Sequence, residues 1–225
     1  IPSLDETMID WANKIDFFLK ENIIILISPL STITIFQDKW NTYKFFKSIN
    51  IKTPKTSLNA DFEIIKPRLG RGGSGIFIND FKSKIIMKKM ISQERVFGEE
   101  YTIDTFFDND GIPIYIVPRK RIHVKDGKST KGVVFESQEI SDLIIHISKQ
   151  TKFIGPINFQ LFKTESNELI FIEVNPRIAG GMALGMAATE NWIPLIISII
   201  SNKKIQAKPI NYGLKMVRYY DELFI

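Results

Sequence analysis

The segments 155–162 and 171–177 are the feature that most constrains the fold of this chain. Each alternates apolar and polar residues, and a polar turn at 163–168 separates them. Two alternating runs joined by a short polar turn predict a β-hairpin. The chain should therefore contain antiparallel strands that carry a row of polar side chains on one face.

The polar side chains of this hairpin suit a metal ion and an oxyanion. Glu173, Asn175 and Arg177 alternate along one strand, and antiparallel pairing can place Gln160 opposite Glu173 or its neighbour. Carboxylate and amide oxygens suit a hard cation such as Mg²⁺, and an arginine suits a phosphate or a carboxylate. We therefore expect a nucleotide–metal site here. The alternative is a strand end whose polar residues face solvent.

A glycine-rich segment, Gly70–Gly75, lies between two predicted strands. It matches the pattern G-x-G-x-x-G, but residues 76–78 favour a strand, whereas a Rossmann motif requires a helix. No Lys-Ser or Lys-Thr pair closes it as in a Walker A loop. The backbone amides of such a loop can close over phosphates, with Lys66 supplying a cation. A plain glycine hairpin turn is the alternative.

Composition limits the class of protein. The 225 residues are 44% hydrophobic, enough for a substantial core and one or two domains. No apolar run is long enough to cross a bilayer, cysteine is absent and no signal peptide is visible, so we expect a cytoplasmic protein. The sequence begins at Ile1, and we expect a fragment or a processed product. The formal charge of +5 comes from dispersed basic residues, which fits an anionic nucleotide better than nucleic acid.

The remaining pattern predicts an α+β order with much antiparallel strand. A helix should begin at Asp38 and end near Ser48, and another should span residues 137–150. The β-branched run at 23–27 predicts a buried strand, and residues 81–89 predict a short amphipathic helix. This order does not resemble a simple βαβ array.

Landmarks between residue 38 and about residue 200 resemble the ATP-grasp superfamily, most closely its carbamoyl-phosphate-synthetase-like branch. They occur in the family's order, and together they form a specific signal. The landmarks are Asp38–Lys39, Ile65–Pro67 before Gly70–Gly75, Gln93–Val96, Gly98–Asp104, Asn158–Gln160 and Glu173–Arg177.

This resemblance implies an ATP-grasp fold, in which two α+β subdomains clamp ATP between antiparallel sheets. Residues 1–30 would be the C-terminal remnant of a preceding α/β domain. Residues 31–92 would form the subdomain with the glycine-rich lid, and residues 93–225 the subdomain with the metal site.

The resemblance also implies roles for individual residues. The ATP-binding positions would be Lys39 and Lys66 at the phosphates, Gly72, Gly73 and Ser74 in the lid, Gln93, Glu94 and Val96 near the adenine, and Glu100 at the ribose. The ligands of Mg²⁺ or Mn²⁺ would be Gln160, Glu173 and Asn175. The residues at the transferred phosphate or the substrate carboxylate would be Arg177 and Arg119.

The implied activity is ATP-dependent ligation of a carboxylate to an amine through an acylphosphate. Such chemistry needs alignment and charge neutralisation but no enzyme nucleophile. One departure concerns residues 178–183, which are glycine-rich where carbamoyl phosphate synthetase has a serine- and arginine-bearing loop. We expect small-molecule carboxylate and amine substrates, leave a homodimer open, and expect no nucleic-acid or membrane partner. The alternative is a non-catalytic ATP-binding regulatory domain.

Overall fold

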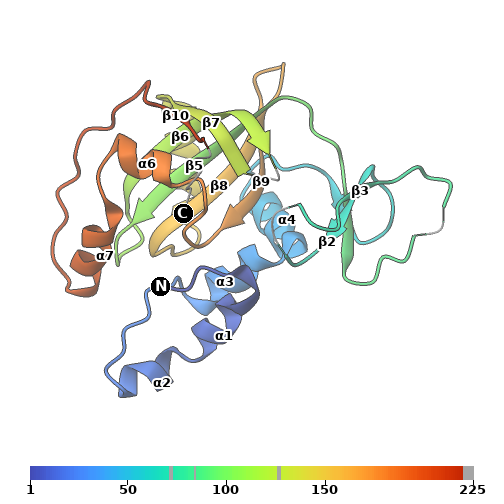
Figure 1. The fold of residues 1–225 in the computed structure, drawn as a ribbon. Coiled ribbons are helices and arrows are strands. Elements are labelled where there is room, and N and C mark those ends of the chain that lie inside the picture. The colour runs from blue at the N-terminus through green and yellow to red at the C-terminus, as the bar shows by residue number, and fades with distance from the viewer. Residues whose placement is uncertain (71–72, 84, 126–127, 220–225) are drawn as a thin grey trace, which may run out of the picture.

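The computed structural model describes residues 1–70, 73–83, 85–125 and 128–219. This part of the chain contains two antiparallel sheets and the helices that pack on them (Figure 1). The α+β class predicted from the sequence is therefore confirmed.

The smaller sheet has four strands in the order β1-β4-β2-β3. Its strands are β1 (Thr56–Ser57), β2 (Ile64–Pro67), β3 (Phe77–Ile78) and β4 (Met90–Gln93). Because β2 and β3 pair antiparallel, the glycine segment between them is a hairpin loop, and no helix follows it. The prediction of a loop between two strands, in place of a Rossmann turn, is confirmed.

The larger sheet has six strands in the order β10-β7-β6-β5-β8-β9. The strands are β5 (Glu99–Phe107), β6 (Pro113–Lys125), β7 (Lys128–Val134), β8 (Gly155–Lys163), β9 (Leu169–Asn175) and β10 (Lys215–Val217). The strands β8 and β9 form the predicted hairpin.

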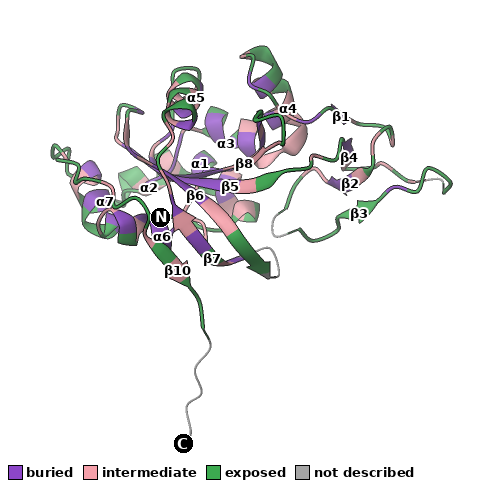
Figure 2. Ribbon diagram, turned by 90° about the horizontal axis from the view of Figure 1, so that it is seen from above, coloured by how far each residue is buried: buried purple, intermediate pink, exposed green. Residues whose placement is uncertain are grey.

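Three helices cover one face of the larger sheet (Figure 2). They are α3 (Leu30–Gln37), α4 (Lys39–Ser48) and α5 (Gln138–Ser148). Alternate apolar residues of the central strands, such as Ile103 and Phe159, are fully buried against this layer. Burying one such side chain stabilises the fold by roughly 1.5–3 kcal/mol.

Two further helices cover only part of the opposite face. They are α6 (Ala183–Ala188) and α7 (Trp192–Ile200). Trp192 is fully buried and stacks on Tyr115 of β6, with 6.1 Å between the ring centroids. The rest of this face carries the polar side chains of β5, β6, β8 and β9, and it turns toward a cleft.

The N-terminal region differs from its prediction. A 3₁₀ helix (Asp5–Thr7) precedes α1 (Met8–Asn13) and α2 (Ile15–Lys20), but residues 23–27 form no strand. Ile23 and Ile24 are exposed, whereas Leu26 and Ile27 are buried in two different clusters. This branched run pairs with no strand in the described structure, so the burial of Leu26 and Ile27 comes from side-chain packing.

The helix expected at residues 81–89 is also wrong. Phe81 and Lys89 have φ angles of 59° and 60°, which an α-helix does not contain. The Asn79 side chain accepts a hydrogen bond of 2.9 Å from the Phe81 backbone N–H, which fixes a turn where the helix would begin. Among the residues described, no helix is long and apolar enough to span a bilayer.

Candidate active site

Two rungs of polar side chains cross the larger sheet. In the first rung Gln160 lies directly opposite Glu173, and Thr102 lies on the other side of Gln160. In the second rung Asn158 lies opposite Asn175. The cross-strand pairing of Gln160 with Glu173 confirms the register expected from the sequence, and it gathers these side chains on one face.

These side chains form a donor set suited to a hard cation. Gln160, Glu173 and Asn175 present two amide oxygens and one carboxylate, all along one wall of a cleft. In the described ranges no group of three or more His, Cys, Asp or Glu residues could hold a metal alone. Because Gln160, Glu173 and Asn175 carry only one carboxylate, they fit a magnesium ion whose remaining ligands come from a bound anion.

A cleft of about 790 Å³ lies over this polar face. Its lining includes Lys66, Glu173 and Gly73 of the glycine loop. A smaller pocket of about 70 Å³ shares these three residues and adds Lys39 and Ser74. The two spaces share lining residues, so the glycine loop, the two lysines and the carboxylate of the metal set lie close together around them.

Lys66 is a buried cation in this space. Its Nζ donates to Gln93 Oε1 at 2.7 Å, and Gln93 Nε2 donates to Thr56 Oγ1 at 2.9 Å. Burial lowers the pKa of Lys66 to about 8, with Glu173 opposing the change and the Lys39 charge adding to it. The Gln93 side chain thus positions Lys66, which lines the cleft.

Lys39 is positioned by the start of α4. Asp38 caps this helix by accepting from the Trp40 N–H at 2.9 Å, and it also forms a bidentate ion pair with Arg68. The Lys39 Nζ donates to the carbonyl of Gly70 at 2.8 Å. Arg68, which the sequence did not single out, therefore ties α4 to the end of β2 beside the glycine loop.

The glycine loop requires its glycines at three described positions. Gly70, Gly73 and Gly75 have φ angles of 104°, 73° and 72°, a region that other residues rarely adopt. Ser74 lies between two of them and lines the smaller pocket. The predicted lid residue Gly72 lies outside the described residues.

The connection from β4 to β5 was the predicted adenine region. Glu94 pairs with Lys55 through backbone and side chain, with Glu94 N donating to the Lys55 carbonyl at 2.9 Å. Arg95 stacks on Phe97, with 4.7 Å between its Cζ and the ring centroid. Val96 is half-buried. The described lining of the cleft includes Glu100 but none of Gln93, Glu94 and Val96.

Arg119 and Arg121 share a face of β6, as expected, and both line the cleft. Arg121 forms an ion pair with Glu100, the predicted ribose ligand. Glu100 lies on β5 and Arg121 on β6. They are neighbours across the two strands, since the adjacent residues Tyr101 and Lys120 lie directly opposite each other in the register. The carboxylate of Glu100 is therefore held in place by a cation at the edge of the cleft.

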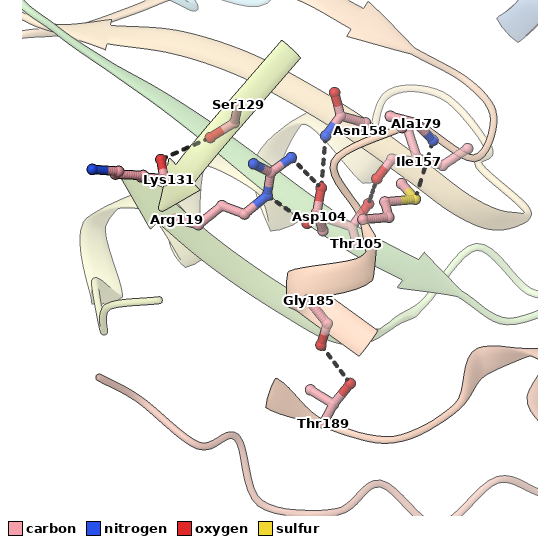
Figure 3. A network of polar contacts seen from close by, with 12 residues as sticks. Asp104, Thr105, Arg119, Ser129, Lys131, Ile157, Asn158, Ala179, Gly185 and Thr189 are labelled. Carbon is pink, nitrogen blue, oxygen red and sulfur yellow. Dashed lines mark hydrogen bonds and ion pairs between the residues drawn. The ribbon is translucent and has the colours of Figure 1, made fainter. Parts of the chain in front are cut away.

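A buried network surrounds Arg119 (Figure 3). Its Nε donates to Asp104 Oδ2 at 2.6 Å, and its Nη2 donates to Asp104 Oδ1 at 3.2 Å. Asn158 Nδ2 donates to the same Oδ1 at 2.7 Å. Asp104 was not predicted as a site residue, although its place two and four residues after Thr102 and Glu100 puts it on the same face of β5.

Arg177 is held by the N-terminal region. Its Nε donates to Asp5 Oδ1 at 2.5 Å, and a second bond joins Nη2 to Asp5 Oδ2. It also donates to Asn175 Oδ1 at 3.1 Å and to the carbonyl of Ile178 at 3.1 Å. Asp5 was another residue that the sequence did not reveal, because 172 positions separate the two partners.

Solved structures share this fold. The biotin carboxylase domain of the Hydrogenobacter thermophilus 2-oxoglutarate carboxylase, solved as a dimer with MgADP, ADP and bicarbonate, gives a TM-score of 0.73 at 14% identity, over 92% of this chain and 55% of that one. N5-carboxyaminoimidazole ribonucleotide synthetase from Thermotoga maritima gives 0.64 at 18% identity, over 89% and 58%. The chain spans less than two thirds of the length of either protein, and at these identities the likeness establishes the fold alone.

Sequence comparisons place the chain in a family. No curated protein sequence matches it. A family model described as "ATP-grasp in the biosynthetic pathway with Ter operon" matches residues 86–221. Because this match covers more than half of the chain and the fold agrees with it, the chain belongs to this ATP-grasp family.

Proposed function

We propose that the chain binds MgATP and transfers its γ-phosphoryl group to a carboxylate, and that an amine then attacks the acylphosphate. The observation that carries this proposal is the grouping of Gln160, Glu173 and Asn175 with the buried Lys66 around one cleft. Similar folds support it, since one was solved with MgADP and bicarbonate and another is a synthetase.

In this proposal the nucleotide lies between the two sheets. Lys39, Lys66, Gly73 and Ser74 would contact the phosphates, Glu100 would bind the ribose, and the backbone near Glu94 and Val96 would meet the adenine. Gln93 would act through Lys66, whose ammonium it orients. The division into a lid subdomain at 31–92 and a metal subdomain at 93–225 belongs to the same proposal.

The metal would be held by Gln160, Glu173 and Asn175. These side chains carry a single negative charge, so the phosphates of ATP must supply the rest, and metal and nucleotide should bind cooperatively. Bound Mg²⁺ or Mn²⁺ would neutralise charge on the phosphate oxygens. The protein would add Lys66 of β2 and Lys39 of α4 to this neutralisation, since both line the same small pocket as Glu173.

The proposed reaction has two steps. First, a carboxylate oxygen bonds to the γ-phosphorus while the bond to the β,γ-bridging oxygen breaks and ADP leaves. Second, the amine nitrogen bonds to the acyl carbon, phosphate leaves with the electron pair of the C–O bond, and the amine loses a proton. Both steps depend on alignment and on the cations of the cleft, and neither needs an enzyme nucleophile.

The order of the landmarks supports the carbamoyl-phosphate-synthetase-like branch as part of this proposal. The glycine-rich loop after Arg177 favours acceptors of the kind that single-copy amino-acid ligases use over bicarbonate. A non-catalytic ATP-binding regulatory domain is the second candidate. The complete set of Gln160, Glu173 and Asn175 weighs against it, because binding without phosphoryl transfer does not require that set.

ADP release by the full-length protein tests the function. The protein would be supplied with MgATP and a panel of carboxylates, each with and without a panel of amines. We expect ADP release that requires a particular carboxylate. Saturable MgATP binding without ADP release in any combination would instead favour the regulatory domain.

A further inference from the structure

We infer that Arg119 binds the carboxylate of the acceptor, the substrate that receives the phosphoryl group, and that Asp104, Asn158 and Gly181 fix the guanidinium for this task. This inference rests on the proposed function and names the ligand of one part of its site. It concerns a binding group and its three positioning residues, which lie on β5, β6, β8 and the loop after β9.

The first observation is an unsatisfied donor. Arg119 is only 2% exposed and lines the cleft, yet its Nη1 has no hydrogen-bond partner. Among the described residues, only this atom and Gln37 Oε1 are buried polar side-chain atoms without a partner. Leaving a charged donor buried and unpaired is unfavourable. An oxyanion in the cleft would supply the missing acceptor.

The second observation is how the other arginines of the cleft are held. Arg121 is paired with Glu100. Arg177 donates to the Asp5 carboxylate, the Asn175 side chain and the Ile178 carbonyl. Both guanidiniums therefore already bind acceptors of the protein. Arg119 uses Nε and Nη2 for Asp104, and no hydrogen bond joins its Nη1 to another residue (Figure 3).

The third observation is the position of Asp104, the partner of Arg119, along β5. Glu100, Thr102 and Asp104 follow one another on the same face, about 7 Å apart. In the proposed function Glu100 marks the ribose, and the rung of Thr102, Gln160 and Glu173 marks the metal and phosphates. Arg119 lies opposite Thr102 in the register, and its guanidinium reaches Asp104 on the second rung, where Asn158 and Asn175 also lie. In the proposed function, the carboxylate that attacks the γ-phosphorus would lie beside this guanidinium.

The loop after β9 gives a steric reason for a glycine here. A Cβ on Gly181 would lie 2.4 Å from Arg119 Nη2, so the guanidinium packs directly against this residue. A Cβ on the neighbouring Gly180 would meet nothing within 4 Å. Gly181→Ala should therefore displace the guanidinium while keeping its charge, and Gly180→Ala is the matched control.

The test is a binding experiment with two simple carboxylate probes. Full-length protein saturated with magnesium and AMPPNP, a nonhydrolysable ATP analogue, would be titrated with ¹³C-labelled acetate and bicarbonate, with the ¹³C linewidth as the measured quantity. We expect saturable broadening by at least one probe in the wild type. Gly181→Ala and Arg119→Lys should weaken that binding by about tenfold or more.

Two control variants and a nucleotide titration accompany this experiment. Gly180→Ala and Lys120→Gln, an exposed change on the opposite face of β6, should bind the probe as the wild type does.

Calorimetry should show unchanged MgAMPPNP affinity for all variants. Loss of that affinity would assign Arg119 to the γ-phosphate and overturn the inference. Wild-type probe affinity in Gly181→Ala, or no saturable binding of either probe by the wild type, would also overturn it. If ADP release fails but this binding pattern holds, the ligase proposal fails alone.

Discussion

Lys66 shows how strongly the fold changes the chemistry of one residue. Burial lowers its pKa to about 8 from the ordinary value of 10.5. The folded chain therefore binds fewer protons than the unfolded chain between these values, so this group makes folding more favourable as pH rises from about 8 toward 10.5. Near pH 8 the free protein holds Lys66 in both protonation states.

We predict that MgATP binding takes up protons near pH 8. The phosphates stabilise the charged form of Lys66 and raise its pKa, so the neutral fraction must be protonated on binding. Affinity should accordingly fall as pH rises above about 8. Calorimetry in two buffers of different ionisation enthalpy would measure the uptake, which Lys66→Arg should reduce because arginine stays charged. Heats that do not depend on the buffer would contradict the assignment.

Glu173→Gln tests the metal set. The change keeps the shape of the side chain but removes the only negative charge of the metal set. We therefore expect ADP release to be lost while the melting temperature changes little. Glu168→Gln is the matched control, because it makes the same substitution in the turn of the same hairpin, at an exposed ion pair with Lys52. Wild-type ADP release by Glu173→Gln would show that the proposed mechanism is wrong.

At the residue scale, the sequence could predict which polar side chains share one face of a strand, because alternate residues of a strand point to the same side. Gln160, Glu173 and Asn175 could be predicted because two short alternating runs determine both their face and their pairing. Asp104 and Asp5 could not be assigned in the same way. Their roles depend on Arg119 and Arg177, which tertiary structure brings to them across strands or across most of the chain.

At the scale of elements, the start of α4 links secondary structure to the cleft. Asp38 is both the helix cap and the partner of Arg68, and the Lys39 backbone N–H donates to the Arg68 carbonyl at 3.0 Å. One carboxylate thus connects α4, the end of β2 and a lysine at the glycine loop. Its loss should affect both the stability of the helix and the position of Lys39.

We predict that Asp38→Ala lowers both stability and MgATP affinity. Loss of the cap alone should cost about 1 kcal/mol of unfolding free energy. Ser137→Ala is the control, since Ser137 caps α5 by accepting from the Ile140 N–H at 3.3 Å, on a helix that lies away from the cleft lining. Denaturation and nucleotide titration should show lost stability in both variants but lost affinity only in Asp38→Ala. Equal affinities would contradict the proposed role of Lys39.

The elements themselves were predictable where local pattern and tertiary contacts agree. The hairpin of β8 and β9 alternates strictly, and Asp38 and Ser137 mark the starts of α4 and α5 as expected. The strand prediction for residues 23–27 was wrong because β-branched residues favour extended backbone whether or not a partner strand exists. The helix prediction for residues 81–89 was wrong because the turn at Asn79 and the positive φ angles of Phe81 and Lys89 override the amphipathic pattern.

At the scale of the whole molecule, residues far apart in the sequence meet at the cleft. Asp5 of the N-terminal region binds Arg177 at the end of β9, and Ser3 lines the cleft. Arg218 beyond β10 donates to the carbonyl of Gly180 at 2.5 Å. The loop after β9 is thereby held from both the N-terminal region and the C-terminal strand. The sequence could not predict these two contacts of the loop, because neither follows from a local pattern.

The pair of Asp5 and Arg177 is the contact of this kind that we expect to matter most for stability. Their side chains are only 13% and 9% exposed, so removing one charge leaves the other buried without its partner. Such losses typically cost about 3–5 kcal/mol. Asp5→Asn should therefore lower the melting temperature and speed hydrogen exchange in α1, whereas Asp10→Asn, an exposed change on α1, should do neither. If both variants behave alike, the N-terminal region is not anchored through Arg177, and the guanidinium would be available to the substrate instead.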